Sequence, residues 1–261
     1  MEAPADLALR IGFLAASALV LLGCPNPNTY TTPRTIGSGH FQGSAAVEGW
    51  GFYVPTTSAN YAPQERLGIY PTPPTFSLRF GLGNSWEIGA RLGNLTSLGG
   101  DIKWNFLKSS RIDLAIDPAF QIYELSSNDG SGKNQTFTYL HVPLLVGVNL
   151  SRTVSLVFTP GATWGFTSAG MIRFTDGPDQ GTTTGALARF GVGADFRIMP
   201  GFALHPEFTL LRGIGGDDRI VYIAGLGFNF GAMPNYDDVG AGPPPPSGSQ
   251  APGADEHRAL R

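Results

Sequence analysis

The feature that most constrains this chain is an alternation of apolar residues with small or charged ones. In the segment 86–92, Trp, Ile, Ala and Leu occupy the even positions, and Glu, Gly and Arg occupy the odd ones. Side chains of a β-strand point alternately to its two faces, so each such segment predicts a strand with one apolar face and one more polar face. About ten segments follow this pattern, near residues 40–53, 74–83, 85–93, 96–107, 111–124, 136–150, 153–165, 185–198, 201–211 and 220–230.

The connections between these segments are alternately short and long. Those around residues 83–84, 108–110, 151–152 and 199–201 are very short, whereas 54–73, 125–135, 166–184 and 212–219 are longer and polar. One connection, residues 93–95, is short where the alternation calls for a long one. Membrane barrels have short turns at one end and longer loops at the other. The pattern predicts an antiparallel up-and-down sheet whose two chain ends lie on the same side.

The composition of the two faces separates a membrane barrel from a soluble one. Charged residues make up 14% of the chain, against about 25% in typical soluble domains. The more polar face is rich in Gly and Ala with isolated charges, while the other face carries Phe, Trp, Leu and Val. A soluble barrel would present many Lys, Glu and Gln residues to water. We therefore predict an all-β fold, a transmembrane barrel of about 10 strands (8–12) with the apolar face toward lipid.

Across residues 40–230 the chain resembles the bacterial outer-membrane β-barrel families of the small porin-like type. The closing segment 225–230 resembles their insertion signal, in which Gly225 is followed at fixed spacing by Phe228 and Phe230. The resemblance implies a location in the bacterial outer membrane, contact with outer-membrane lipid, and the barrel-assembly machinery as a partner.

The first residues have the pattern of an export signal. The segment 11–23 is an unbroken apolar and small run after Arg10, too short to span a bilayer as a helix. The sequence Leu21-Leu22-Gly23-Cys24 resembles the lipobox of bacterial lipoproteins, which implies a lipid on Cys24 and the lipoprotein-export machinery as a partner. An ordinary cleavage site or a buried helix is the alternative. Cys24 is the only cysteine, so no disulfide is possible within the chain.

Four regions follow from these patterns. Residues 1–23 are predicted to form a signal peptide with a helix, and the Pro- and Asn-rich residues 24–39 a lipidated tether. Residues 40–230 form the barrel. Residues 231–261, with four consecutive prolines at 243–246, are predicted to be a disordered tail.

The polar face carries charges of both signs, which must be paired if they lie away from water. We predict that they form ion pairs in the barrel interior and fill it, with His141 and His205 nearby. The candidates are Glu48, Arg79, Glu87, Arg91, Asp101, Lys103, Asp113, Asp117, Arg189, Asp195, Arg197 and Glu207.

No motif points to a cofactor, a metal or catalysis. The net charge of −3 offers no basic patch for nucleic acid, and the acidic pairs at 176/179 and 217/218 have the pattern of turns. We expect a non-enzymatic barrel with a structural or surface role, or narrow passage of a small solute. Two alternatives stay open: a soluble periplasmic, lipid-anchored β-protein that binds an apolar ligand, and a barrel-borne hydrolase using His205, Glu207 and His141.

Four prolines, Pro118, Pro143, Pro160 and Pro206, fall within predicted strands. Because a closed barrel has no free edge, each missing N–H must be accommodated by a bulge or an early strand end.

Overall fold

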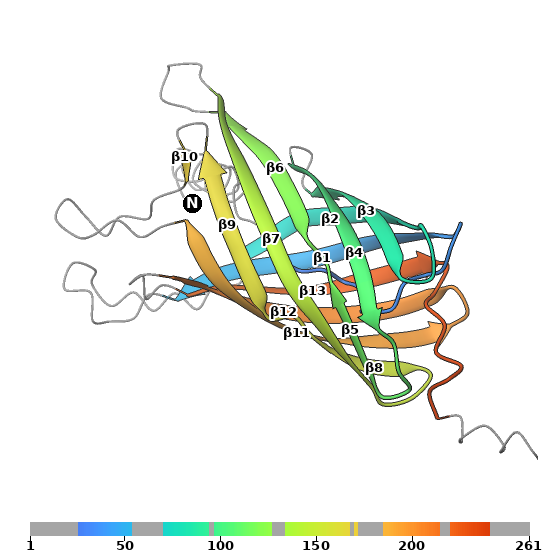
Figure 1. The fold of residues 1–261 in the computed structure, drawn as a ribbon. Coiled ribbons are helices and arrows are strands. Elements are labelled where there is room, and N and C mark those ends of the chain that lie inside the picture. Colours follow the sequence, from blue (N-terminus) through green and yellow to red (C-terminus); the bar gives the residue numbers. More distant parts are fainter. Residues whose placement is uncertain are drawn as a thin grey trace, which may run out of the picture.

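The structure, a computed structural model, describes residues 26–53, 70–93, 97–126, 134–167, 170–171, 185–214 and 220–240. Their strands close into one antiparallel barrel, seen from the side in Figure 1. This confirms the predicted fold class. The signal helix, and the tail beyond residue 240, lie outside the described residues. Within the described ranges, no helix is long and apolar enough to cross a membrane.

The barrel wall has ten strands, which are built from twelve of the thirteen hydrogen-bonded segments. Two wall strands are each interrupted once, so that β5 and β6 form one strand and β8 and β9 form another, while β10 only forms a short hairpin with β9. The ring closes where the first segment pairs with the last, from Gln42↔Gly231 to Tyr53↔Ile220. The segments are β1 (Phe41–Tyr53), β2 (Tyr70–Gly81), β3 (Trp86–Gly93), β4 (Ser97–Leu107), β5 (Ile112–Ile116), β6 (Ala119–Ser126), β7 (Asn134–Asn149), β8 (Val154–Phe158), β9 (Gly161–Thr167), β10 (Gly170–Met171), β11 (Ala186–Met199), β12 (Phe202–Gly213) and β13 (Ile220–Gly231).

The two ends of the barrel differ, as the sequence predicts. At one end, short turns join β2 to β3, β4 to β5, β7 to β8 and β11 to β12; we call this the short-turn end. The tightest of these turns uses Gly201, whose φ of 81° is a left-handed conformation that suits glycine. The opposite, loop end carries the remaining connections, most of whose residues lie outside the described ranges.

The interruptions in the wall coincide with prolines. Pro118 lies between β5 and β6, and Pro160 lies between β8 and β9. The carbonyl oxygens of these two prolines accept hydrogen bonds from Ile102 N at 3.0 Å and Leu144 N at 2.8 Å, which keeps the neighbouring strands attached. Pro143 and Pro206 lie inside β7 and β12. Two of the four prolines are therefore accommodated at strand interruptions, and the other two lie within continuous strands.

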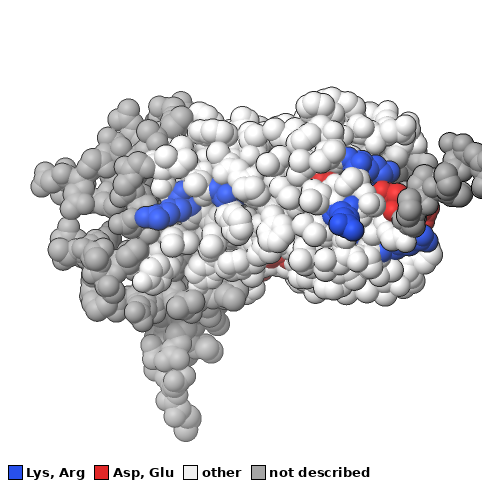
Figure 2. All heavy atoms as spheres, turned by 60° about the horizontal axis from the view of Figure 1, so that its bottom comes forward, with Lys and Arg blue, Asp and Glu red and all other residues white. Residues whose placement is uncertain are grey.

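The outer face of the wall is apolar and the inner face is polar. Trp86 is 44% exposed, Phe190 51% and Leu98 61%, whereas the alternating residues Glu87 and Lys103 are almost completely buried. In Figure 2 most of the middle of the visible surface is white, and the largest group of charged atoms lies at the short-turn end, on the right. Most tryptophans and phenylalanines of the strands face outward; Trp50 and Phe137, near the loop end, are exceptions on the inner face. The soluble alternative, whose large apolar side chains would line an internal cavity, does not fit a wall that exposes most of them on its outer face.

Candidate functional site: the occupied barrel interior

The interior holds the chain's own N-terminal segment. Residues 26–36, which we call the plug, precede β1 and are buried inside the barrel, apart from partly exposed Asn26 and Thr35. The sequence predicts a lipidated tether over residues 24–39, and for residues 26–36 this prediction is wrong, because they lie inside the barrel. The segment has no apolar periodicity, but its amides, hydroxyls and one guanidinium find partners on a wall lined with charges, which compensates for leaving water.

The plug runs from the loop half of the barrel to the short-turn end. Asn26 N donates to Gln121 Oε1 at 3.0 Å, and Asn26 Nδ2 donates to the Glu48 carboxylate. Glu48 lies in the loop-side half of β1, and Gln121 in that of the strand made by β5 and β6. At the other end, Thr35 Oγ1 donates to Asn84 O in the turn between β2 and β3. From there the chain continues directly into β1.

In the middle of the barrel one wall carboxylate holds the plug backbone. Glu207 Oε2 accepts hydrogen bonds from the backbone N–H groups of Thr29 at 2.9 Å and Tyr30 at 2.7 Å. Hydrogen bonds that involve a charged group are roughly twice as strong as neutral ones. Asn229 Nδ2 donates to Tyr30 O on the other side, at 3.0 Å.

Two glycines of β13 make room for the plug's tyrosine. A Cβ atom added to Gly225 would lie 1.9 Å from Tyr30 Oη, and one added to Gly227 would lie 2.8 Å from Tyr30 Cδ1. Farther along, a Cβ atom on Gly147 would lie 3.0 Å from the Pro33 ring. These three inward glycines thus leave space that the plug occupies, whereas Gly89 and Gly191 leave space for wall side chains.

Lys103 joins the plug to a cluster of buried charges on the wall. Its Nζ contacts Thr31 Oγ1 at 2.9 Å, Thr32 O at 3.0 Å and Arg34 O at 3.2 Å. The cluster itself consists of Arg79–Glu87 at 2.9 Å, Arg79–Asp101 at 3.0 Å, Arg79–Asp117 at 3.3 Å and Lys103–Glu87 at 2.9 Å.

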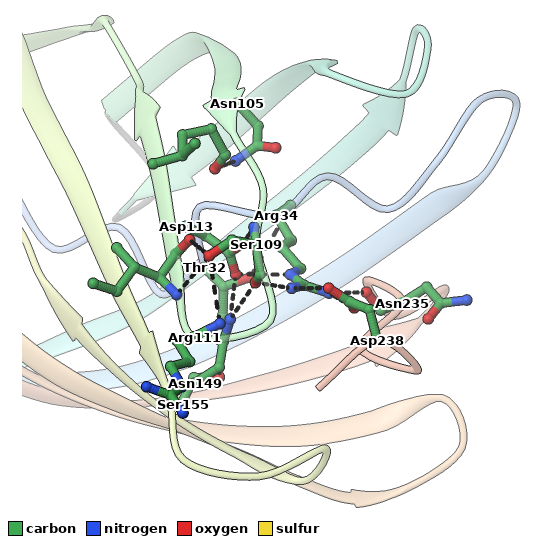
Figure 3. Close-up of polar contacts among 12 residues, drawn as sticks. Thr32, Arg34, Asn105, Ser109, Arg111, Asp113, Asn149, Ser155, Asn235 and Asp238 are labelled. Atoms are coloured by element: carbon green, nitrogen blue, oxygen red, sulfur yellow. Dashed lines mark hydrogen bonds and ion pairs between the residues drawn. The ribbon is translucent and has the colours of Figure 1, made fainter. Parts of the chain in front are cut away.

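At the short-turn end, Arg34 is enclosed by wall and C-terminal residues, as Figure 3 shows. Arg34 is 1% exposed, and its Nε lies 2.7 Å from Asp113 Oδ2. Its other nitrogens contact the Asp238 carboxylate, Asn235 O and Ser109 O, the last two at 2.6 Å. These hydrogen bonds from Arg34 hold the pKa of Asp238 below its usual value.

An aromatic ring completes this arrangement. The guanidinium carbon of Arg34 lies 4.3 Å from the centroid of the Tyr236 ring, and that of Arg197 lies 3.7 Å from it. Both distances are within the range of cation–π attraction. We call Arg34, Asp113, Tyr236 and Asp238 the clamp. The tail was expected to be disordered from residue 231 onward, which is wrong for residues 232–240, because buried Tyr236 and Val239 fix them against the short-turn end.

The structure brings most of the predicted interior charges together. Besides the Arg79–Lys103 cluster, Arg189 lies 3.5 Å from Glu207, and Arg197 pairs with Asp195. Six of the predicted charges contact the plug directly: Glu48, Glu87, Arg91, Lys103, Asp113 and Glu207.

Sequence reasoning missed the plug and the clamp. One signal was available: Arg34 is the only Lys or Arg between Arg10 and Arg66, and it stands in a segment of Thr, Pro and Asn. A single cation in such a segment, facing an interior with an acidic excess, indicates a partner inside the barrel.

The side chains considered for hydrolysis are buried in the barrel interior. His205 is 0% exposed, with Nδ1 3.4 Å from Asp195 Oδ1 and Nε2 3.9 Å from Glu207 Oε2, and Tyr30 packs edge-on against its ring. His141 Nδ1 contacts Thr163 Oγ1 at 2.9 Å on the wall. Neither ring reaches bulk solvent. No group of three metal-binding side chains occurs in the described ranges, and the acidic pairs at 176/179 and 217/218 lie outside them.

The three insertion-signal residues lie on both faces of β13. Gly225 faces inward beneath Tyr30, and Phe230 is exposed on the outer face near the short-turn end. Phe228 alternates with Gly227 and shares the outer face. Cys24 lies outside the described residues, which begin two positions later at Asn26.

Neither the protein-family models nor the curated proteins contain a match to this sequence. Among solved structures, the attachment invasion locus protein Ail of Yersinia pestis matches with 15% identity over 74% of this chain and 98% of its own, at a TM-score of 0.34. The protease OmpT of Escherichia coli matches with 11% identity over 74% and 97%, at 0.41. An outer membrane channel from Pseudomonas putida F1 matches with 10% identity over 80% and 100%, at 0.43. At these identities and TM-scores, none of them assigns a function to this chain.

Proposed function

We propose that this protein is a non-catalytic β-barrel of the bacterial outer membrane whose interior is closed by its own N-terminal plug. Its role is structural or at the cell surface. The observation that carries the proposal is the plug itself: residues 26–36 lie along the interior from the loop half to the short-turn end and contact the wall at each level described above.

The outer face supports the membrane location. Large apolar side chains are exposed on strand after strand, for example Phe76, Ile102, Phe120 and Phe208. Exposed apolar area of this extent is unusual on a soluble monomer and is expected of a lipid-facing wall. Outer-membrane lipid is accordingly the first partner, and the barrel-assembly machinery, through Gly225, Phe228 and Phe230, is the second.

The absence of catalysis is part of the proposal, and the plug supports it. His205 and Glu207 are completely covered by Tyr30 and the backbone of Thr29. A substrate could reach these groups only after the plug had left. The mutual contacts of His205, Asp195 and Glu207 are those of interior side chains that satisfy one another.

Narrow passage of a small solute is the second candidate, and one observation favours it. Within the part of the chain that the structure describes, two buried amide oxygens at the contact between plug and wall, Asn28 Oδ1 and Asn229 Oδ1, have no hydrogen-bond partner. Each such atom costs free energy relative to water. Withdrawal of the plug would hydrate these atoms and open the interior.

We further propose a lipid on Cys24, with the lipoprotein-export machinery as a partner. Two residues of chain span at most about 7 Å, and Asn26 is held in the loop half of the barrel. If the short turns face the periplasm, as is usual, a lipid in the periplasmic leaflet and an inserted plug exclude each other, so the lipid anchor is an alternative to the closed interior. Mass spectrometry of the mature N-terminus tests whether Cys24 is acylated.

Conductance in planar bilayers tests the closed state. The wild-type protein should insert, migrate differently on gels before and after boiling, and show no steady open steps. Frequent open steps of the wild type would instead support passage. Failure to insert into any bilayer would overturn the proposed location.

A further inference from the structure

Three exposed cations at the short-turn end have no carboxylate partner. Lys108 and Arg111 lie in the turn between β4 and β5, and Arg152 lies in the turn between β7 and β8. The two turns are neighbours, because β5 pairs with β7 from Ile112↔Val148. No ion pair of these three side chains occurs within the described residues; Arg152 Nε donates to a backbone oxygen, that of Val239, at 3.1 Å.

The nearby carboxylates are engaged elsewhere. Asp113 and Asp238 pair with Arg34, and Asp195 pairs with Arg197. Exposed Asp237 accepts a hydrogen bond from Asn235 Nδ2. Of these carboxylates, only that of Asp237 takes no part in an ion pair with a described residue, and Lys108 also attracts the Asp238 carboxylate at longer range. Figure 2 shows charged atoms of both signs gathered at this end, beside a broad uncharged wall.

The cations stand at the edge of the lipid-facing surface. Leu107, Ile112 and Leu150, which flank them in sequence, are exposed apolar residues, with Leu150 60% exposed. The exposed apolar side chains of a membrane barrel contact acyl chains. Cations that follow them directly in the sequence therefore lie at the depth of the lipid headgroups.

We infer that Lys108, Arg111 and Arg152 form a binding site for an anionic phospholipid headgroup in the leaflet at the short-turn end. The phosphodiester oxygens would accept hydrogen bonds from the two guanidinium groups and the ammonium group. The inference rests on the proposed membrane location and adds a lipid class to it. It does not depend on whether the plug opens.

The experiment compares lipid binding of the intact barrel in mixed micelles by native mass spectrometry, with phosphatidylglycerol and phosphatidylcholine as the probes. The wild-type protein should retain phosphatidylglycerol in preference to phosphatidylcholine by roughly fivefold or more per engaged cation. The variant carrying Lys108→Gln and Arg111→Gln should lose most of that preference. Arg152 is left in place because it also holds Val239.

Arg212→Gln is the matched control, because Arg212 is an exposed cation near the loop end of β12. This variant should keep the wild-type preference. Equal binding of the two lipids by the wild type would overturn the inference, as would a preference that survives in the double variant or disappears in the control. Heat-modifiable migration and insertion into vesicles are measured on the same samples. Normal insertion without lipid preference overturns the lipid site alone, whereas failure to insert overturns the proposed location as well.

Discussion

The two halves of the plug are held in different ways. In the loop half, the residues from Asn26 to Tyr30 donate uncharged N–H groups to Glu48 and Glu207. In the short-turn half, Arg34 brings a formal charge into a buried site and is met by two carboxylates, two backbone oxygens and an aromatic ring. Water can replace uncharged donors at little cost, but a buried charge cannot lose one partner without a large penalty. We conclude that the plug is fastened at the short-turn end and is easier to release at the loop end.

The largest effect is expected from Arg34→Ala, which leaves Asp113 buried without its cation. Removing one member of a buried ion pair costs about 3–5 kcal/mol, and the free energy of unfolding should fall by that order. Urea titration in lipid vesicles, followed by tryptophan fluorescence, measures it. Arg34→Lys is the control, since it keeps the charge but not the planar fork, and it should recover part of the loss. A loss below about 1 kcal/mol for Arg34→Ala would show that the clamp does not fasten the plug.

Gly227→Val should release the loop half by removing the space under Tyr30. The added side chain would begin 2.8 Å from the tyrosine ring, too close for the ring to stay. We expect open conductance steps in planar bilayers that the wild type lacks. Ala224→Val adds similar bulk on the outer face of the same strand and should stay closed. Closed behaviour of both variants would indicate that Tyr30 is not what keeps the plug in place.

A smaller effect is expected from Glu207→Gln. The amide keeps the shape, and its oxygen and Thr159 still accept from Arg189, which lies 3.5 Å from Glu207. The hydrogen bonds to the N–H groups of Thr29 and Tyr30 weaken, and hydrogen bonds to a charged group contribute about 1.5–3 kcal/mol. Urea titration should show a loss within that range, smaller than that of Arg34→Ala. The reverse order of the two losses would contradict the difference between the halves.

The smallest effect is expected at Asp238, whose side chain is 43% exposed. Because Arg34 lowers its pKa in the folded state, Asp238 stabilises the fold above its unfolded pKa, and this contribution is lost as the pH falls through the folded pKa, below about 4. Exposure limits it to less than about 1 kcal/mol. Asp238→Asn should therefore lose slightly less stability than the wild type between pH 7 and pH 3. An equal loss in both proteins would exclude a role of this carboxylate.

The wall was predictable from the sequence, and its contents were not. Alternation with period two fixes which side chains of a strand share a face, so Trp86 and Glu87 were assigned to opposite faces before the structure was known. The same logic identified the charges that line the interior. The alternation could not predict which of these charges pair with one another, because the register of neighbouring strands does not determine which long side chains meet across the interior.

The plug has no such periodic signal. Its residues are the Pro, Asn and Thr types that also compose exposed linkers, so composition alone favoured a tether. The contact between Arg34 and Asp238 joins residues 204 positions apart, and only the closed ring brings them together. Gly225 and Gly227 were recognised as inward residues, but the tyrosine that fills their space lies nearly 200 positions earlier.

Thiol reactivity of the plug is the most direct test of whether it fills the barrel. In a Cys24→Ser background, Thr32→Cys places a thiol at a buried plug position. Ser38→Cys places one at an exposed position between the plug and β1. Reaction of the folded protein with a bulky maleimide should modify position 38 rapidly and position 32 only after unfolding. Equal rates at the two positions in the folded barrel would show that residues 26–36 lie outside it, and the closed interior would have to be abandoned.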